Sequence, residues 1–339
     1  MSKVAVVILN WNTKEILEKY LVSVCKYSRS DEVEIVVADN GSSDDSVDFV
    51  EQNYPDVRVI CLKENHGFAG GYNRALKSIQ AEYYVLLNSD VEVTENWLDP
   101  MMKRLENDGK IAACMPKIKA CLEKDKFEYA GAAGGFIDKY GYPFCRGRIM
   151  DSVERDCGQY DEASEIFWAS GACLFIRSEL FWEVDGFDED FFAHMEEIDL
   201  CWRLKNLGHQ IWYEPDSTVY HLGGGTLPYD NPKKLFLNFR NNLWLLYKNL
   251  PDEAFQSILF KRKVLDGIAG FKLLSEGNIK GLLTVFKAHG AYYRELKQLK
   301  RKRSKVSKVN RNNLGHYSRS VVFEYFIRKK RRFSDLNWR

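Results

Sequence analysis

The sequence lacks a long uncharged apolar run, a leader-like N-terminus and any paired cysteine motif. No stretch of about 18 uncharged apolar residues occurs, which argues against a membrane-spanning helix. An apolar strand-like segment begins at Val4, so we expect no signal peptide. The eight cysteines are scattered without C-x-x-C or zinc-finger spacing. We therefore expect free, mostly buried thiols in a reducing cytoplasm.

Net charge is also nearly absent, but its distribution is uneven. Residues 291–339 carry 16 Lys and Arg against three acids, a net charge of +13. The remaining 290 residues carry 33 basic and 45 acidic side chains, a net charge of −12. An acidic body with a basic tail is therefore predicted, although charge alone does not specify what the tail binds.

What the sequence does have is a regular alternation of apolar and amphipathic segments. Expected strands at 4–9, 33–39, 57–62 and 83–87 are separated by expected helices at 14–27, 44–53 and 70–80. This alternation predicts βαβ units and an α/β fold with a mostly parallel sheet. Further along we expect helices at 95–108 and 196–207, strands at 210–213 and 217–221, and helices after Pro232. We predict a catalytic domain over 1–230 and a helical, basic region over 231–339.

Acidic residues follow two of the expected strands. Asp90 ends the segment Asn88-Ser89-Asp90 directly after an apolar run, and Asp39 ends an earlier strand. Carboxyl ends of parallel strands face the crevice in which open α/β sheets bind ligands. The alternatives are a helix-capping turn at Asp90 and an ordinary turn at Asp39. The glycines Gly67, Gly70 and Gly71 enter an expected helix, where close backbone approach and free amides would suit an anion, or simply a tight turn.

Later residues add a possible base and a possible metal ligand. Glu196, Glu197 and Asp199 open an expected helix. Asp199 and Arg203 have i, i+4 spacing, which predicts a structural ion pair. Either glutamate could act as a general base if it faces the crevice, and a solvated helix start is the alternative. His221 follows a short strand, where it could bind a metal or only end the strand.

The first strand is not followed by the G-x-G-x-x-G loop of dinucleotide-binding proteins. A diphosphate would therefore have to be neutralised elsewhere, and a cation held by Asp90 is the simplest solution. Oxygen ligands suit Mg²⁺ or Mn²⁺, and His221 favours Mn²⁺ slightly.

In their order and spacing these segments resemble glycosyltransferase family 2, and most closely its bacterial rhamnosyltransferase-like branch. The resemblance covers about residues 3–250 and is carried by residues 8–12, 37–42, 65–73, 87–90 and 196–203. It implies a GT-A fold with a nucleotide-sugar half at about 1–115 and an acceptor half at about 116–230. Donor-binding residues implied by position are Asn10, Asn12, Asp39, Asn65, Gly67, Gly70, Gly71, Asn73, Asn88 and Ser89, with Asp39 on the pyrimidine base.

The same resemblance implies inversion of configuration with a divalent metal and a carboxylate base. Asp90 matches the metal-binding end of the family's D-x-D motif, in which Asn88 replaces the first Asp, and His221 matches a further metal ligand. Glu197 stands where the family has its catalytic Asp, although Glu196 is a neighbouring candidate. A carboxylate with an ordinary pKa of about 4.3 is a weak base for a sugar hydroxyl, which predicts late proton transfer.

The expected activity is transfer from a nucleotide-diphospho-sugar to a glycan or lipid-linked acceptor in cell-surface polysaccharide synthesis. dTDP-L-rhamnose is the leading donor, and the alternatives are UDP-galactofuranose, UDP-N-acetylglucosamine and UDP-glucose. A nucleotidyltransferase is disfavoured because no Gly-rich phosphate loop is present near the N-terminus. A nucleic-acid- or sugar-binding protein without catalysis would not need the acidic site.

The basic tail suggests a location at the inner face of the cell membrane. Basic residues flank an aromatic and apolar stripe over 321–327, a pattern typical of a helix on an anionic leaflet. We therefore predict a cytoplasmic protein with peripheral membrane contact through 291–339. The alternative is a helical region attracted to the acidic body, and nucleic-acid binding is not expected.

Overall fold

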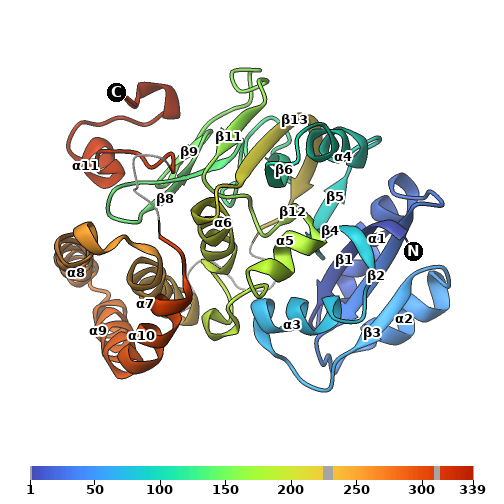
Figure 1. Cartoon of the computed structure of the whole chain (residues 1–339), viewed down its shortest axis with the longest axis horizontal. Helices are drawn as coiled ribbons and strands as arrows, with labels where there is room; N and C mark the ends of the chain where they lie inside the picture. The colour runs from blue at the N-terminus through green and yellow to red at the C-terminus, as the bar shows by residue number, and fades with distance from the viewer. Residues whose placement is uncertain (1, 224–231, 309–313, 339) are drawn as a thin grey trace.

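The computed structural model describes residues 2–223, 232–308 and 314–338 (Figure 1). At its centre is a nine-stranded sheet in the order β11-β13-β6-β12-β4-β1-β2-β3, with β5 paired to β13. Its strands are β1 Ser2–Asn10, β2 Val33–Asp39, β3 Arg58–Cys61, β4 Ala81–Asn88, β5 Val91–Val93, β6 Ile111–Ala120, β11 Ser164–Ile166, β12 Cys173–Arg177 and β13 Gln210–His221. β1, β2, β3 and β4 run parallel, whereas β12 is antiparallel to β4 and β6.

The uninterrupted apolar run of β4 follows from its position between β1 and β12. Residues 83–87 are all at most 3% exposed. A strand with neighbours on both edges and cover on both faces needs apolar side chains on both sides, so it does not alternate. The predicted α/β fold with a mostly parallel central sheet is confirmed.

Helices surround this sheet and continue beyond it. They are α1 Lys14–Tyr27, α2 Ser46–Asn53, α3 Gly67–Leu76, α4 Leu98–Asn107, α5 Ser178–Glu183, α6 Glu196–Asn206, α7 Pro232–Asn249, α8 Asp252–Ser275, α9 Ile279–Arg294, α10 Leu296–Lys305 and α11 Val321–Phe326. Short 3₁₀ turns lie at Glu189–Phe191 and Phe333–Asp335. α7 to α10 gather on one side of the molecule, away from β1, β2 and β3 (Figure 1).

The two strands predicted at 210–213 and 217–221 are one strand, β13, and that detail of the prediction was wrong. β13 pairs with β6 from Gln210 to Glu214 and again from Thr218 to His221, and a register shift between the two stretches absorbs residues 215–217. The interrupted apolar pattern therefore reflects a β-bulge and not a chain reversal.

A second, four-stranded sheet packs against the C-terminal segment. It consists of β7 Gly135–Ile137, β8 Pro143–Cys145, β9 Arg148–Ile149 and β10 Ser152–Val153. Side chains of this sheet and of 314–338 form a separate core of Phe144, Ile149, Tyr317, Val321, Tyr325 and Leu336. Asp138, which is fully buried, accepts a hydrogen bond of 2.9 Å from the N–H of Val321. α11 accordingly lies beside β8 and β9 (Figure 1).

This packing divides the apolar stripe predicted at 321–327. Val321 and Tyr325 are buried in the second core, while Phe323 and Ile327 are 48% and 65% exposed. The stripe is therefore not a single exposed helix face. None of the described helices is long and apolar enough to cross a bilayer.

Some of the tail's positive charge is matched by the acidic body. Lys302 forms ion pairs with Asp188 and Asp190, and Arg303 pairs with Asp252. The predicted domain boundary at 230 lies in 224–231, outside the described residues.

Candidate active site

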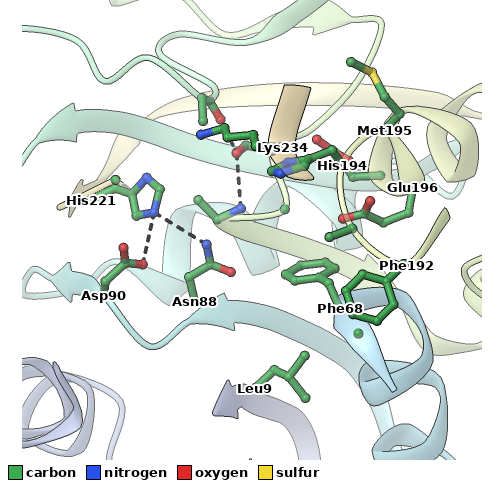
Figure 2. A pocket seen from close by; sticks show the side chains of 18 of the residues that line it. Leu9, Phe68, Asn88, Asp90, Phe192, His194, Met195, Glu196, His221 and Lys234 are labelled. Atoms are coloured by element: carbon green, nitrogen blue, oxygen red, sulfur yellow. Dashed lines mark hydrogen bonds and ion pairs between the residues drawn. The ribbon is translucent and has the colours of Figure 1, made fainter. Parts of the chain in front are cut away.

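A cavity of about 360 Å³ opens at the carboxyl ends of β1 and β4. Of the residues predicted from the sequence, nine line it: Asn10, Asn65, Gly67, Asn88, Ser89, Asp90, Glu196, Glu197 and His221. The other five are not among its described lining residues: Asn12, Asp39, Gly70, Gly71 and Asn73. Asp90 and His221 lie on one side of the cavity and Glu196 on the other (Figure 2). The carboxyl ends of these parallel strands thus border a cavity, as expected, and the roles of its lining residues stay predictions.

Strand register brings Asp90 and His221 together. Asp90 occupies the turn between β4 and β5, and His221 ends β13 opposite Val91 of β5. Nε2 of His221 lies 3.1 Å from Oδ1 of Asp90, and Nδ1 lies 3.3 Å from Oε2 of Glu128. Burial lowers the pKa of His221, but the two carboxylates outweigh burial and raise this pKa to about 10.

Asp90 and His221 fit a shared divalent cation. The carboxylate oxygen of Asp90 and the imidazole nitrogen of His221, 3.1 Å apart, would supply two ligands of the kind that Mn²⁺ takes. Within the described residues no group of three or more His, Cys, Asp or Glu side chains is arranged to hold a metal. Water and phosphate oxygens would therefore complete the coordination, as is usual for Mg²⁺. A bound cation would displace the proton from Nε2 of His221.

Asp39 and Asn12 shape the loop beside the cavity. The Oδ1 atom of Asp39 accepts a hydrogen bond of 3.0 Å from Asn10, and Oδ2 accepts one of 2.9 Å from the N–H of Ser42. Asn12 accepts a hydrogen bond of 2.7 Å from the N–H of Ser43. These bonds fix the loop after β2 against the end of β1. The contact of Asp39 with a donor base stays a prediction.

Gly67 is the first residue of α3 and lies against the loop that contains Phe192. Its φ is +72°, and a Cβ there would lie 2.6 Å from the carbonyl oxygen of Phe192. The same oxygen accepts hydrogen bonds from the N–H groups of Phe68 and Ala69, at 2.7 and 3.3 Å. The expectation that these first amides stay free for an anion is therefore wrong, because the protein itself uses them. Asn65 accepts a 2.8 Å bond from the N–H of Gly67 and so fixes the turn.

The remaining predicted residues of this segment pack inside the protein. A Cβ on Gly71 would lie 2.9 Å from side-chain atoms of Leu9 and Asn40, so glycine permits close helix–strand packing. Asn73 donates to the carbonyl of Phe187 at 2.8 Å and accepts from its N–H at 3.0 Å. Gly70 lies within the same helix, and its surroundings are Arg74 and His66. Their donor-binding roles stay predictions without support from this geometry.

Glu196 and Glu197 place two desolvated carboxyl groups at the start of α6. The Oε2 atom of each is buried and has no hydrogen-bond partner among the described residues. Burial and the neighbouring Glu197 raise the pKa of Glu196 well above its ordinary value. Burial raises the pKa of Glu197 to about 7, partly offset by backbone hydrogen bonds. This pKa is higher than the ordinary value of about 4.3 expected from the sequence, and the role of either glutamate as the base stays a prediction.

The backbone before these glutamates is strained. Phe192, His194 and Met195 all have positive φ, at 66°, 70° and 73°. Non-glycine residues rarely adopt such values, and they persist only where surrounding contacts enforce them. Asn241 of α7 supplies such contacts, since its amide donates to the carbonyl groups of Phe191, Ala193 and His194 at 2.8 to 3.0 Å. The C-terminal helices therefore help to shape the site.

Asp199 is structural, as its spacing predicts. It is fully buried and accepts hydrogen bonds of 2.8 Å each from Arg203, Lys248 and Asn249. These cations and the amide compensate the desolvation of its carboxylate. Asp199 joins α6 to α7 and is not available to a substrate.

Sequence reasoning missed several lining residues, among them Glu128, Arg148, Trp168, Lys233 and Lys234. Glu128 precedes the Gly-rich turns and reaches His221 only through the folding of the segment after β6. Lys234 lies at the start of α7, and burial lowers its pKa. An isolated carboxylate or a pair of lysines gives no sequence signal of such a role.

Solved structures share this fold. The crystal structure of S. aureus TarS 1–349 in complex with UDP-GlcNAc superposes on 88% of this chain, and the match covers 83% of that structure. The TM-score is 0.58 and the sequence identity is 16%. The structure of GalNAc-T7 with UDP, GalNAc and Mn²⁺ superposes on 73% of this chain, and the match covers 48% of that structure. The TM-score is 0.57 and the sequence identity is 18%. These likenesses show that the chain has the GT-A fold.

The sequence comparisons name the family within this class. The family model "Glycosyl transferase family 2" matches residues 5–184, and the chain belongs to that family. Over 223 residues it is 27% identical to an N-acetylglucosaminyl-diphospho-decaprenol L-rhamnosyltransferase of Mycobacterium tuberculosis, covering 60% of this chain and 71% of that one. Over 193 residues it is 28% identical to a pre-mycofactocin glycosyltransferase of the same organism, covering 55% and 37%. The protein is therefore a glycosyltransferase.

Proposed function

We propose that this glycosyltransferase is inverting and metal-dependent, and that it moves L-rhamnose from dTDP-L-rhamnose to a hydroxyl of a glycan or lipid-linked glycan. The observation that carries the reaction type is the carboxylate of Glu197, whose buried Oε2 atom has no hydrogen-bond partner among the described residues, in the same cavity as the Asp90–His221 pair. Glu197 would accept the proton of the acceptor hydroxyl, and the Asp90–His221 pair would hold the metal that neutralises the diphosphate. The relative named as a rhamnosyltransferase supports the donor.

Glu197 acts on the acceptor. Its raised pKa of about 7 makes its ionised form a better proton acceptor than an exposed carboxylate, while a useful fraction stays ionised at neutral pH. It removes the hydroxyl proton as the acceptor oxygen bonds to the anomeric carbon. The bond from that carbon to the diphosphate breaks on the opposite face, so the configuration inverts. The pKa of Glu196 is raised by burial and by the neighbouring Glu197, so of the two carboxyl groups Glu197 is the one assigned the role of base.

The residues on the opposite side of the cavity receive the leaving group. Asp90 and His221 would hold Mn²⁺ or Mg²⁺, which supplies positive charge against the departing diphosphate. Asn65, Asn88 and Ser89 line the same cavity and can donate to nucleotide or sugar oxygens, whereas the amide of Asn10 already donates to Asp39 and Ser42. Lys233 and Lys234 line it as well and add cationic character near the diphosphate.

A panel of nucleotide sugars tests the proposal. Thermal shift and donor hydrolysis are measured with dTDP-L-rhamnose, UDP-N-acetylglucosamine, UDP-galactofuranose and UDP-glucose, each with Mn²⁺, Mg²⁺ or EDTA. We expect the largest metal-dependent shift and the fastest turnover with dTDP-L-rhamnose. A preference for a UDP-sugar would refute the donor assignment, and full turnover in EDTA would refute the metal. The anomeric configuration of the product, read by NMR, tests inversion.

A further inference from the structure

Helices α8 and α9 form a hairpin with large apolar side chains on its outer surface. Phe260, Ile268 and Phe271 of α8 are 60% to 69% exposed, and Ile279, Leu283 and Phe286 of α9 are 51% to 64% exposed. The hairpin face comprises these residues together with Val264, Leu274 and Tyr293, which are also exposed. Apolar surface gathered over two helices is unusual on a monomeric soluble protein and marks an interaction site.

The residues of the hairpin face are spaced to form one continuous surface. They recur every three or four residues on α8 and three, four or seven on α9, so each helix carries one stripe. The two stripes border the same seam between the helices. Lys263 contacts the hydroxyl of Tyr293 across it at 3.0 Å, and Gly270 approaches Leu282. Leu282 is itself a helical neighbour of Ile279 and Phe286.

Basic side chains run along both edges of this face. Lys280, Lys287 and Arg294 recur every seven residues on α9, and all three are exposed. On α8, Lys261 and Lys272 are exposed and lie three turns apart. Glu276 forms an ion pair with Lys272 and so offsets that one cation. Asp266 is buried against Arg262 and His289, and Asp252 pairs with Arg303, so neither of these acids offsets the other four basic side chains.

We propose that the hairpin face binds the surface of an anionic phospholipid bilayer. An apolar stripe bordered by lysine and arginine matches a helix lying in the interface plane, with its apolar side among the acyl chains and its cations at lipid phosphates. A second copy of the chain fits less well. A twofold contact would bring the basic edges of one copy against those of the other, whereas a leaflet neutralises both edges.

If the hairpin face lies on the bilayer, α7 connects the membrane-bound helices to the active site. α7 packs against α9 on one side, and through Asn241 it holds the strained loop before Glu196 on the other. A lipid-linked acceptor would then reach the cavity from the surface on which the hairpin lies. That last consequence rests on the proposed function, while the binding of lipid does not.

Vesicle sedimentation tests the membrane proposal directly. The full chain is mixed with vesicles of phosphatidylglycerol and phosphatidylcholine, or of phosphatidylcholine alone. We expect binding to the anionic vesicles and a loss of roughly tenfold or more in the Phe271→Ser/Phe286→Ser variant, because burial of two phenyl rings is removed. The Lys280→Glu/Lys287→Glu variant should lose the preference for anionic lipid. Phe323→Ser, an exposed phenylalanine on α11, is the matched control and should bind as the wild type does.

Three results would overturn the proposal. They are absence of vesicle binding by the wild type, unchanged binding by the double phenylalanine variant, and a wild-type dimer in light scattering that this variant abolishes. Metal-dependent thermal shift with dTDP-L-rhamnose, measured without vesicles, should be the same for wild type and variants. Failure of that shift in all of them would count against the proposed function and leave the lipid result standing.

Discussion

Replacing Glu197 by glutamine separates the roles of its charge and its shape. Glutamine is almost isosteric but cannot take up a proton, so we expect donor affinity to be preserved and turnover to fall by about 10²- to 10⁴-fold, the usual contribution of a general base. The same substitution should change stability in a pH-dependent way. Both effects come from one feature, the burial of this carboxyl group at the start of α6.

The magnitude follows from the pKa. Burial raises the pKa of Glu197 from 4.5 to about 7 in the folded protein, so folding favours the protonated form. Below pH 4.5 the group is protonated in both states and costs nothing. As the pH rises from 4.5 through 7, the unfolded state ionises first and stability is lost, by as much as about 3 kcal/mol at about 1.4 kcal/mol per pKa unit. Glu197→Gln has no such loss.

Urea denaturation at pH 5 and pH 8.5 measures this difference. The variant should gain stability relative to the wild type at pH 8.5 and show little gain at pH 5. Single-turnover rates at pH 7.5 give the catalytic effect, and Glu196→Gln is the paired control, with a smaller loss of turnover expected. A larger loss for Glu196→Gln would exchange the two roles. Equal stability differences at both pH values would refute the account of the buried charge.

Two further substitutions test the rest of the site. Asp90→Ala should abolish the Mn²⁺-dependent thermal shift with nucleotide sugar and reduce turnover to background, while circular dichroism shows an unchanged fold; near wild-type turnover would mean that the metal lies elsewhere. Asn241→Ala should lower the free energy of unfolding by about 1–3 kcal/mol, because the carbonyl groups of Ala193 and His194 lose this side-chain donor while that of Phe191 keeps Arg240, and should reduce kcat more than donor affinity. If donor affinity falls and kcat does not, Asn241 does not act by positioning the loop before Glu196.

The parts of the site that the sequence predicts correctly depend on local rules. Asp90 follows an apolar strand, and the carboxyl ends of parallel strands meet at one edge, so its position is fixed once the α/β class is recognised. The structural role of Asp199 follows from its i, i+4 spacing with Arg203. Both predictions depend only on residues that are close in the sequence, within one strand or helix or at its end.

The parts that it misses depend on distant contacts. Glu128 lies 93 residues before His221 in the sequence, and only the folded segment after β6 brings the two together. The raised pKa of Glu197 does not follow from the sequence, because burial is a property of the assembled cavity. In the same way, the sequence does not show that the apolar stripe at 321–327 is divided, with Val321 and Tyr325 covered by the second sheet while Phe323 and Ile327 stay exposed. An apolar residue can contact a membrane or a partner only if it is exposed, and the sequence pattern does not show whether it is exposed.

The hydrogen bond from Val321 to Asp138 has a consequence for biosynthesis. The two residues are 183 positions apart. At a translation rate of about 5–20 residues per second, Asp138 leaves the ribosome roughly 10 to 40 s before its partner is made. During that interval Phe144 and Ile149 lack the C-terminal side chains that cover them in the finished protein. The nascent chain therefore carries an incomplete core until residues 314–338 have been made, and we expect chaperone binding to be concentrated on this sheet.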